Sequence, residues 1–382
     1  MHVIVVGAGT VGLCCALELA GRGAKVTLID RGLVGGENST RTGGGIRQQF
    51  GTALNIKLSL MAAPFWSSFE EKTGIDHLFR ATGYLFLAKT EGEADALRSQ
   101  VELQHSLGVD SVYLSRQDLE RRWPALGGRD IVAASFRQND GWANQQRIIE
   151  GLHRAVVKAG VELMVGTEVL SLIEVSGSVK GVMTTVGPVA GDAVTLATGP
   201  WCTPLLQPLG LSVPVGAHRH ELLIVEPAAP LPADLPWLIG LTDQVHMRPD
   251  YPGRALLGGF LGHDEPGSMD GWATRADPEW TRDVLATTAR VFGLVDERAV
   301  VRHGWAGIYC STPDRHPIID RLHPGLYSAL GMSGTGLMHA PAVGMLIADL
   351  VVDGNMPEEF KGGLAAARFA DWMPKAGEKS GF

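Results

Sequence analysis

The first thirty residues predict a strand, a helix and a second strand joined by a glycine-rich turn. The β-branched run Val3–Val6 suits a buried parallel strand, and the sequence GAGTVG of residues 7–12 follows it without a spacer. Apolar residues then recur at helical spacing up to residue 20, and residues 25–29 form a second apolar run that ends at Asp30. This order of elements is typical of the βαβ unit of a Rossmann-type sheet.

Each glycine of the turn has a physical task in such a unit. Gly7 makes the tight turn, Gly9 lets the backbone approach a pyrophosphate, and Gly12 permits close packing of the helix on the sheet. The helix N-terminus supplies N–H donors, and Asp30 accepts a ribose hydroxyl. Three spaced glycines are a weak signal in a chain with 49 glycines, but the flanking strands, helix and acid predict dinucleotide binding. They do not separate FAD from NAD.

Composition limits the classes of partner. Apolar residues make up 45% of the chain and charged residues 19%, which is typical of a folded globular protein. The formal charge of −8 comes without a basic run, so we expect small-molecule partners and no nucleic acid. The four cysteines have no zinc-like spacing, so we expect no metal and a reducing, cytoplasmic location. We also expect no transmembrane segment, because no run of about 18 apolar residues occurs.

Five segments resemble one flavoprotein family. They are NSTRTGGGIRQQFG at 38–51, GVELMVGTEV at 160–169, VTLATGPW at 194–201, TPDRHPIID at 312–320 and GMSGTGLMHAPAVG at 331–344. The first is a polar, glycine-dense loop where an NAD domain would have its next strand. Together the segments resemble the D-amino-acid oxidase superfamily, nearest to the branch of the sarcosine oxidase beta-subunit and proline dehydrogenase. The resemblance covers most of the chain and selects FAD over NAD.

The resemblance implies a fold of the α/β plus α+β class, in which two domains interleave. A Rossmann-type FAD-binding domain is expected over 1–80, 142–214 and 311–382, and an antiparallel-sheet substrate domain over 81–141 and 215–310. Local patterns agree, because residues 83–88, 131–136, 220–225, 245–248 and 255–260 predict strands in the gaps. We further expect Pro341 to open a core helix whose positive end faces the flavin.

The same resemblance implies which residues contact FAD. The expected set is Gly7, Gly9, Thr10, Val11, Gly12, Asp30, Arg31, Thr42, Gly43, Gly44, Gly45, Arg47, Gln48, Val169, Thr198, Gly199, Trp201, Gly307, Gly334, Thr335, Gly336, Leu337 and Met338. The cysteine that binds flavin covalently in some relatives aligns with Gly307, and Cys310 is out of register. We therefore expect non-covalent FAD.

The chemistry implied is removal of hydride from a carbon that bears an amine. A substrate carboxylate calls for an arginine, whose planar fork binds both oxygens and stays charged. Arg47 aligns with the arginine that holds this carboxylate in relatives, although a surface or phosphate-contacting role is an equal alternative. The further catalytic candidates are Arg248, Trp305, Tyr309 and His339.

Histidines supply the candidates for accepting the amine proton. These are His246, His263, His316 and His339, since an imidazole titrates near neutrality. A structural role is the ordinary alternative for each of them.

Two positions depart from the family pattern. Met338 stands where amine-oxidising relatives have a lysine near the flavin, so that lysine's role does not transfer. Leu257 aligns with a lysine that assists oxygen in sarcosine-type oxidases, and an apolar residue there favours a dehydrogenase or a slow oxidase.

The leading prediction is FAD-dependent oxidation of the C–N bond of a small secondary, N-methyl or D-amino acid. Oxygen, a quinone or a partner protein would accept the electrons. One alternative is the flavin-bearing subunit of a hetero-oligomer that passes electrons to a partner. The other is an NAD-dependent dehydrogenase without flavin.

Overall fold

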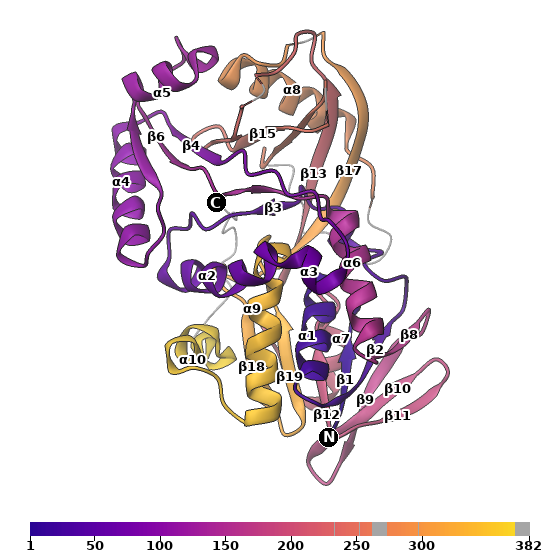
Figure 1. Ribbon diagram of the computed structural model, residues 1–382. Coiled ribbons are helices and arrows are strands. Elements are labelled where there is room, and N and C mark those ends of the chain that lie inside the picture. Colours follow the sequence, from indigo (N-terminus) through magenta and orange to yellow (C-terminus); the bar gives the residue numbers. More distant parts are fainter. Residues whose placement is uncertain (233, 252, 262–272, 297, 371–382) are drawn as a thin grey trace.

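Two sheets organise the protein, as the computed structural model shows (Figure 1). The structure describes residues 1–232, 234–251, 253–261, 273–296 and 298–370. The first sheet draws its strands from residues 2–30, 162–165, 193–196 and 318–330, and the second from residues 84–137 and 216–311. Both sheets therefore combine segments that are far apart in the sequence.

The first sheet contains the predicted βαβ unit at its centre. In the described residues it has six strands in the order β18-β19-β12-β1-β2-β8. Their bounds are β1 His2–Val6, β2 Lys25–Asp30, β8 Glu162–Val165, β12 Ala193–Leu196, β18 Ile318–His323 and β19 Leu326–Leu330. All neighbours pair in parallel except β18 and β19. Residues Val3–Val6 of the central strand β1 are all apolar because both faces of the strand are buried there.

Helices cover one face of this sheet and a small sheet covers the other. Val3 and Val5 pack in the cluster that includes helices α1 (Thr10–Gly21), α6 (Gln145–Lys158) and α9 (Gly336–Ala348). Ile4 and Val6 point the opposite way, into a cluster with β9 (Val169–Val175), β10 (Ser178–Thr184) and β11 (Gly187–Ala190). Because alternate side chains of a strand point to opposite faces, the apolar run Val3–Val6 contributes to two separate cores.

The second sheet is the base of the other domain. Its order in the described residues is β17-β13-β16-β15-β14-β4-β6-β5, and every neighbouring pair is antiparallel except β14 with β4. The bounds are β4 Tyr84–Ala88, β5 Val112–Ser115, β6 Ala133–Arg137, β13 Gly216–Glu226, β14 Trp237–Gly240, β15 Val245–Pro249, β16 Ala255–Gly259 and β17 Val300–Ser311. All five predicted strands are confirmed within a few residues. The long strands β13 and β17 descend from this sheet toward the first one (Figure 1).

The two faces of the second sheet have different environments. Leu85, Leu87 and Leu257 pack with α5 (Arg116–Arg122) and α8 (Pro278–Phe292) in one apolar cluster. Tyr84 and Trp237 lie on the other face. The remaining elements are β3 Gly45–Ile46, β7 Gly141–Trp142, α2 Ala53–Ser67, α3 Phe69–Thr73, α4 Glu91–Ser106, α7 Thr203–Leu206 and α10 Glu358–Leu364.

The C-terminal helix begins earlier than predicted. Helix α9 starts at Gly336, and Pro341 lies inside it rather than at its first position. Proline has no N–H, so the carbonyl of Leu337 loses its helical partner, a cost that burial of the whole helix offsets. Helix α9 and the π-helical turn after it form one helical stretch, Gly336–Asp353. Among the described residues this stretch has the length and hydropathy of a membrane span, but 67% of it is buried inside the protein. Core helices pass the same test.

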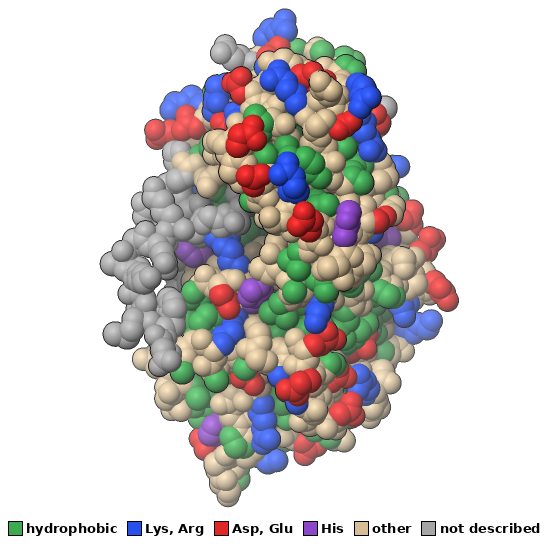
Figure 2. Space-filling model, turned by 90° about the vertical axis from the view of Figure 1, so that its left-hand side faces the viewer, with side chains coloured by type: hydrophobic (Ala, Val, Ile, Leu, Met, Phe, Trp, Pro, Cys, Tyr) green, Lys and Arg blue, Asp and Glu red, His purple; other side chains and the backbone are tan. Residues whose placement is uncertain are grey.

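The surface and the cysteines agree with the composition. On the face drawn in Figure 2, Lys and Arg side chains are interspersed with Asp and Glu rather than gathered in a basic patch. Cys14, Cys15, Cys202 and Cys310 are buried and free. Within the part of the chain that the structure describes, no cluster of His, Cys, Asp or Glu could hold a metal ion. His263 and residues 371–382 lie outside the described residues.

Candidate active site

A cavity of about 860 Å³ is lined by residues of both sheets. The N-terminal turn, the loop over residues 35–52, the cavity-facing side of the second sheet and the start of α9 supply most of its wall. The predicted site residues that line it are Gly7, Gly9, Thr10, Val11, Asp30, Arg31, Thr42, Gly43, Gly45, Arg47, Val169, Thr198, Gly199, Trp201, Gly307, Tyr309, Gly334, Thr335, Gly336, Leu337 and Met338. The structure therefore brings together six segments from across the sequence.

The N-terminal turn is built so that backbone lies open to a ligand. Gly7 has φ +105°, and a Cβ there would lie 2.4 Å from the carbonyl oxygen of Ala197. A Cβ on Gly12 would lie 1.8 Å from the carbonyl oxygen of Gly7. Gly12 does not line the cavity, and its role is the close packing expected of the third glycine.

The start of α1 offers unused donors to an anion. Gly9 is the N-cap residue and has no side chain to cap the helix. The N–H of Thr10 is donated to the Ser39 hydroxyl (2.9 Å), which leaves the N–H groups of Val11 and Gly12 for another acceptor. The hydroxyls of Thr10 and Thr198 are buried without a hydrogen-bond partner among the described residues. The free N–H groups of α1, the two hydroxyls without a partner and the absence of side chains at the glycines together fit a bound pyrophosphate.

The side chains beyond this turn suit the nucleoside. Asp30 accepts hydrogen bonds from the backbone N–H of Ala8 (2.6 Å) and of Gly32 (2.7 Å), which fixes its carboxylate at the cavity edge. Each carboxylate oxygen can accept a further bond, which leaves capacity for a ribose hydroxyl. The guanidinium of Arg31 lies 4.6 Å from the ring centroid of Trp201, and Val169 lines the same end.

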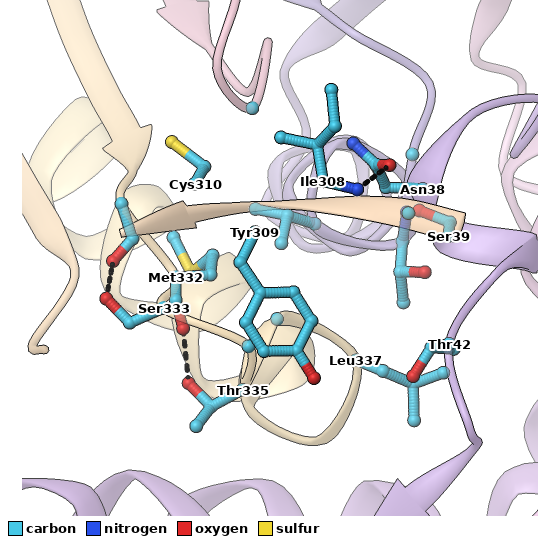
Figure 3. Close-up of a pocket in the computed structure, with 18 of the residues that line it drawn as sticks. Asn38, Ser39, Thr42, Ile308, Tyr309, Cys310, Met332, Ser333, Thr335 and Leu337 are labelled. Carbon is cyan, nitrogen blue, oxygen red and sulfur yellow. Dashed lines mark hydrogen bonds between the residues drawn. The ribbon is translucent and has the colours of Figure 1, made fainter. Parts of the chain in front are cut away.

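A second glycine-rich loop meets β17 further along the cavity. The Asn38 side chain accepts a hydrogen bond from the backbone N–H of Ile308 (2.7 Å), as Figure 3 shows. Trp305 donates its indole N–H to the carbonyl of Arg41 (2.7 Å). These two bonds hold the 38–45 loop beside β17. A Cβ on Gly43 would lie 2.8 Å from the Trp237 ring, so glycine is needed for this approach.

The third wall is the start of α9. Residues 334–338 line the cavity, and a Cβ on Gly334 would lie 2.5 Å from the ring of Tyr309. Figure 3 shows the Tyr309 ring pointing from β17 toward Thr335 and Leu337, while Cys310 points to the other side of the strand. The helix N-terminus places its partial positive charge at this wall. The two glycine loops and the helix start fit a flat ring such as the flavin.

Arg47 has the surroundings of a substrate anchor. It lines the cavity, and its guanidinium stacks over Phe50 (4.0 Å to the centroid) and Phe86 (5.3 Å). Its guanidinium donates a hydrogen bond to the carbonyl of Gln49. No carboxylate among the described residues forms an ion pair with it. Burial lowers the pKa of Arg47, and the nearby Tyr84 and Asp140 raise it in part.

The loop that carries Arg47 is fixed by a buried carboxylate. Asp140 accepts hydrogen bonds from the backbone N–H of Gln48 (2.9 Å) and from the Gln49 side chain (3.2 Å), and it pairs with Arg137 (2.7 Å). Gln48 therefore does not line the cavity, whereas Gln49 does. The side-chain direction in this loop could not be read from the sequence, because the partner that sets it lies more than ninety residues away.

Three expected catalytic residues and Gly44 do not line the cavity. Arg248 is buried and binds the carbonyl of Gly43 (3.1 Å) and the carboxylate of Asp250 (2.9 Å), so its charge is already compensated. Trp305 supports the 38–45 loop, as described above. Gly44 packs against the Ala143 carbonyl, where a Cβ would lie 2.1 Å away. Arg248, Trp305 and the backbone at Gly44 therefore support the cavity wall without lining it.

The third of these residues, His339, is fully buried behind Phe50, with ring centroids 5.0 Å apart. Neither ring nitrogen has a hydrogen-bond partner among the described residues. Burial, assisted by the charge of Arg47, lowers the pKa of His339 to about 3. It is a neutral core residue of α9 in this structure.

This burial predicts a pH dependence of stability. The unfolded state takes up a proton at His339 below pH about 6.5 and the folded state does not, so stability falls as pH falls. Between pH 7 and pH 5 the His339→Leu variant should lose about 2 kcal/mol less unfolding free energy than the wild type. Urea unfolding at the two pH values measures this. The exposed His153→Leu control should keep the wild-type loss, and an equal loss in all three proteins contradicts the assignment.

His246 presents a defined hydrogen-bonding group. It lines the cavity, and its Nδ1 accepts the indole N–H of Trp237 (3.3 Å). An indole can only donate, so the neutral ring carries its proton on Nε2. Burial lowers the pKa of His246 to about 3, with Arg248 acting in the same direction. His246 is thus a hydrogen-bond donor at Nε2 rather than a proton acceptor.

Leu257 does not support the expectation of a dehydrogenase. Its side chain is fully buried in the cluster on the far face of the second sheet, away from the cavity. Because successive strand residues point to opposite faces, Leu256 packs with Tyr84 and Trp237 on the other face of the sheet. Gly259, at the end of β16, is the residue of this strand that lines the cavity. A lysine at 257 would not reach a ligand from this strand position, so its absence carries no information about oxygen.

Several cavity residues were not among the candidates. His220 packs its ring against Tyr309 (4.2 Å between centroids) and Phe260 (4.4 Å). Tyr84 stacks on Trp237 at 4.8 Å, and burial raises the pKa of Tyr84, which keeps its hydroxyl neutral. Strand alternation could have identified His220 and Tyr84, since both belong to strands with one face toward the cavity. His316, which was a candidate, also lines the cavity.

Known proteins match the whole architecture. The model of the family described as FAD dependent oxidoreductase (DAO) matches residues 2–350. Glycine oxidase of Geobacillus kaustophilus is 28% identical over 360 residues, which cover 91% of this chain and 92% of that protein. 4-Methylaminobutanoate oxidase (formaldehyde-forming) of Paenarthrobacter nicotinovorans is 26% identical over 370 residues, 93% of this chain and 44% of that protein. The crystal structure of L-proline dehydrogenase from P. horikoshii superposes with a TM-score of 0.88 at 27% identity, covering 97% of this chain and 98% of that one.

Proposed function

We propose, on the premise that this chain belongs to the DAO family of FAD-dependent oxidoreductases, that it oxidises the C–N bond of a small amino or imino acid. The proposed substrates carry a free carboxylate and a primary, secondary or N-methylated amine. The names of the relatives support this class, since glycine oxidase and L-proline dehydrogenase act on carboxylated amines. The observation that carries the proposal is the unpaired guanidinium of Arg47 in the cavity wall.

Arg47 has the chemistry to orient such a substrate. Its planar fork binds both oxygens of a carboxylate, and an arginine keeps its charge at any working pH even when burial lowers its pKa. The rings of Phe50 and Phe86 hold the guanidinium in place and keep water from its faces. A carboxylate held here leaves the amine-bearing carbon to face the rest of the cavity.

The remaining wall supplies position and a dry environment. FAD, when bound, supplies the two-electron acceptor for the C–N oxidation. Tyr84 has a neutral hydroxyl and His246 a fixed Nε2–H, so both act as donors that orient substrate or cofactor oxygens. Apolar and aromatic side chains around them, including Trp237 and Phe260, limit access of water.

The cofactor is expected to be held without a covalent bond. Gly307 has no side chain to form one, and Cys310 points away from the Tyr309 side of β17 (Figure 3). Burial raises the pKa of the Cys310 thiol to about 12, so the nucleophilic thiolate is scarce. Acid precipitation of the protein should release all yellow colour to the supernatant. Colour retained in the pellet would mean a covalent flavin.

Anaerobic reduction of the flavin tests the proposed function. Glycine, sarcosine, proline and D-alanine are added in turn, and loss of absorbance near ~450 nm reports reduction of the cofactor. Methylamine, dimethylamine and pyrrolidine are matched controls that lack the carboxylate, and we expect no reduction by them. If dithionite bleaches the flavin but none of the amino or imino acids does, the proposal is wrong.

Reoxidation then assigns the electron acceptor. The reduced protein is mixed either with oxygen or with an artificial dye, and the two rates are compared. Rapid recovery with oxygen assigns an oxidase. Recovery with dye alone assigns a dehydrogenase, for which a quinone or a partner protein is the natural acceptor.

A further inference from the structure

We propose that Arg315 forms a second anion-binding position in the cavity, so that the preferred substrates are amino or imino acids with two carboxylates. The inference rests on the proposed function and narrows its substrate class. One carboxylate binds Arg47, and the other, on the nitrogen substituent or on the side chain, binds Arg315.

Arg315 is presented to the cavity by an unusual backbone. It follows β17 in the turn before β18 and has φ +60°, a left-handed conformation that a non-glycine residue rarely adopts. Its side chain is half-buried and lines the cavity. Burial lowers the pKa of Arg315, which means that the structure desolvates this cation without neutralising it.

Neighbouring acids do not compensate Arg315. Its chain neighbour Asp314 accepts hydrogen bonds from the guanidinium of Arg368 (2.8 Å) and from the backbone N–H of His316 (3.1 Å). These bonds hold the pKa of Asp314 well below its usual range. Asp314 is therefore ionised, and its charge is balanced by Arg368. Among the described residues, no carboxylate forms an ion pair with Arg315. Its N–H donors are left for a ligand.

The turn that carries Arg315 lies beside the loop that carries Arg47. The two segments are joined by a hydrogen bond between Thr52 and Nε2 of His316, which is 3.0 Å long. Tyr309 contributes to the electrostatic environment of both arginines and raises the pKa of each. Both arginines line the cavity, and Tyr309 lies in the wall near each of them.

The charge balance of this end favours a dianion. Glu221, which the second sheet contributes to the cavity wall, is paired with Arg219 (2.7 Å) and accepts the backbone N–H of Asp277 (2.6 Å). Two uncompensated cations in a partly desolvated cavity attract a ligand with two negative charges and disfavour a cationic side chain.

Non-reactive acids test the binding position without turnover. The protein with oxidised FAD is titrated with acetate, malonate, succinate and glutarate, and the change in visible flavin absorbance reports binding. We expect one dicarboxylate to bind about 10- to 100-fold more tightly than acetate, which is the contribution of one charge-assisted contact. The optimal chain length then reports the spacing of the two guanidiniums.

Variants assign the gain to one residue. Arg315→Gln should bind that dicarboxylate no more tightly than acetate, and Arg315→Lys should keep part of the gain because it keeps the charge. Arg321→Gln is the matched control, since Arg321 is exposed on β18 and does not line the cavity. It should match the wild type. FAD content of each variant confirms that the cavity is intact.

A substrate pair connects the position to catalysis. In anaerobic flavin reduction, N-carboxymethylglycine should exceed sarcosine in kcat/KM at least about tenfold in the wild type, and Arg315→Gln should remove this preference. Equal affinity of acetate and every dicarboxylate in the wild type overturns the inference, as does a gain that survives in Arg315→Gln. If sarcosine still reduces the flavin in that case, the proposed function stands. If dicarboxylates bind through Arg315 but no amino acid reduces the flavin, the proposed function fails and the binding position stands.

Discussion

Replacing Arg47 with methionine should weaken substrate binding at least about 30-fold while the cofactor remains bound. Methionine keeps an apolar stem between Phe50 and Phe86 but removes the charge that holds the carboxylate. Loss of one partner from a desolvated charge pair costs about 2–5 kcal/mol, or roughly 30- to 3,000-fold in affinity. The apparent dissociation constant of the substrate in anaerobic flavin reduction measures this effect.

Folding should tolerate this substitution. The carboxylate that fixes the loop, Asp140, keeps its bonds from Arg137 and from Gln48, so the loop does not depend on the Arg47 charge. FAD content and the flavin spectrum should therefore match those of the wild type. The Arg47→Lys variant should be intermediate, because an ammonium keeps the charge but loses the planar fork. A change below about threefold in Arg47→Met, with FAD retained, would place the carboxylate elsewhere.

The parts of the fold that the sequence predicts well are set by local patterns. The βαβ unit is found at β1, α1 and β2 with bounds within a few residues of those expected, because strand alternation, glycine turn and helical spacing all agree there. The strands of the second sheet are predicted for the same reason. The pairing order of the two sheets was not predicted, because neighbours such as β1 and β12 are about 190 residues apart and no local pattern relates them.

The site was predicted less completely because long-range contacts decide which side chains reach the cavity. Gln48 and Gln49 are adjacent and chemically identical, and only their bonds to Asp140 and to the carbonyl of Tyr84 decide which one faces the ligand. Arg248 and Arg315 look equally suitable as arginines at strand ends. The structure compensates the first with Asp250 and leaves the second exposed to the cavity.

Helix α9 shows a related limit of local rules. Proline is common at the first position of a helix, which predicts a start at Pro341. The preceding turn is already helical, because residues 336–340 are packed against α1 and α2 in the main core. This shift of five residues moves His339 from a loop near the flavin into a buried helical position, which explains why its expected catalytic role has no geometric support.

Replacing Gly9 with aspartate should abolish tight FAD binding without unfolding the protein. Gly9 is the N-cap residue of α1 with φ −74° and ψ 179°, an extended conformation that aspartate adopts readily. Its carboxylate would accept the first-turn N–H groups and so occupy the position proposed for the pyrophosphate. The new negative charge would also repel the phosphates. We expect FAD affinity to fall at least about 100-fold, because several charge-assisted hydrogen bonds are lost together.

Stability separates this effect from misfolding. Aspartate and glycine differ by only a few tenths of a kcal/mol as N-cap residues, so the unfolding free energy of the FAD-free protein should be almost unchanged. A Cβ at this position meets the Ser39 hydroxyl at 2.9 Å, a small group that can rotate away. The control is Gly92→Asp, which adds the same acid to the first turn of α4, where the Cβ has open space. It should bind FAD as the wild type does. Wild-type FAD affinity in Gly9→Asp would show that the phosphates do not bind at the start of α1.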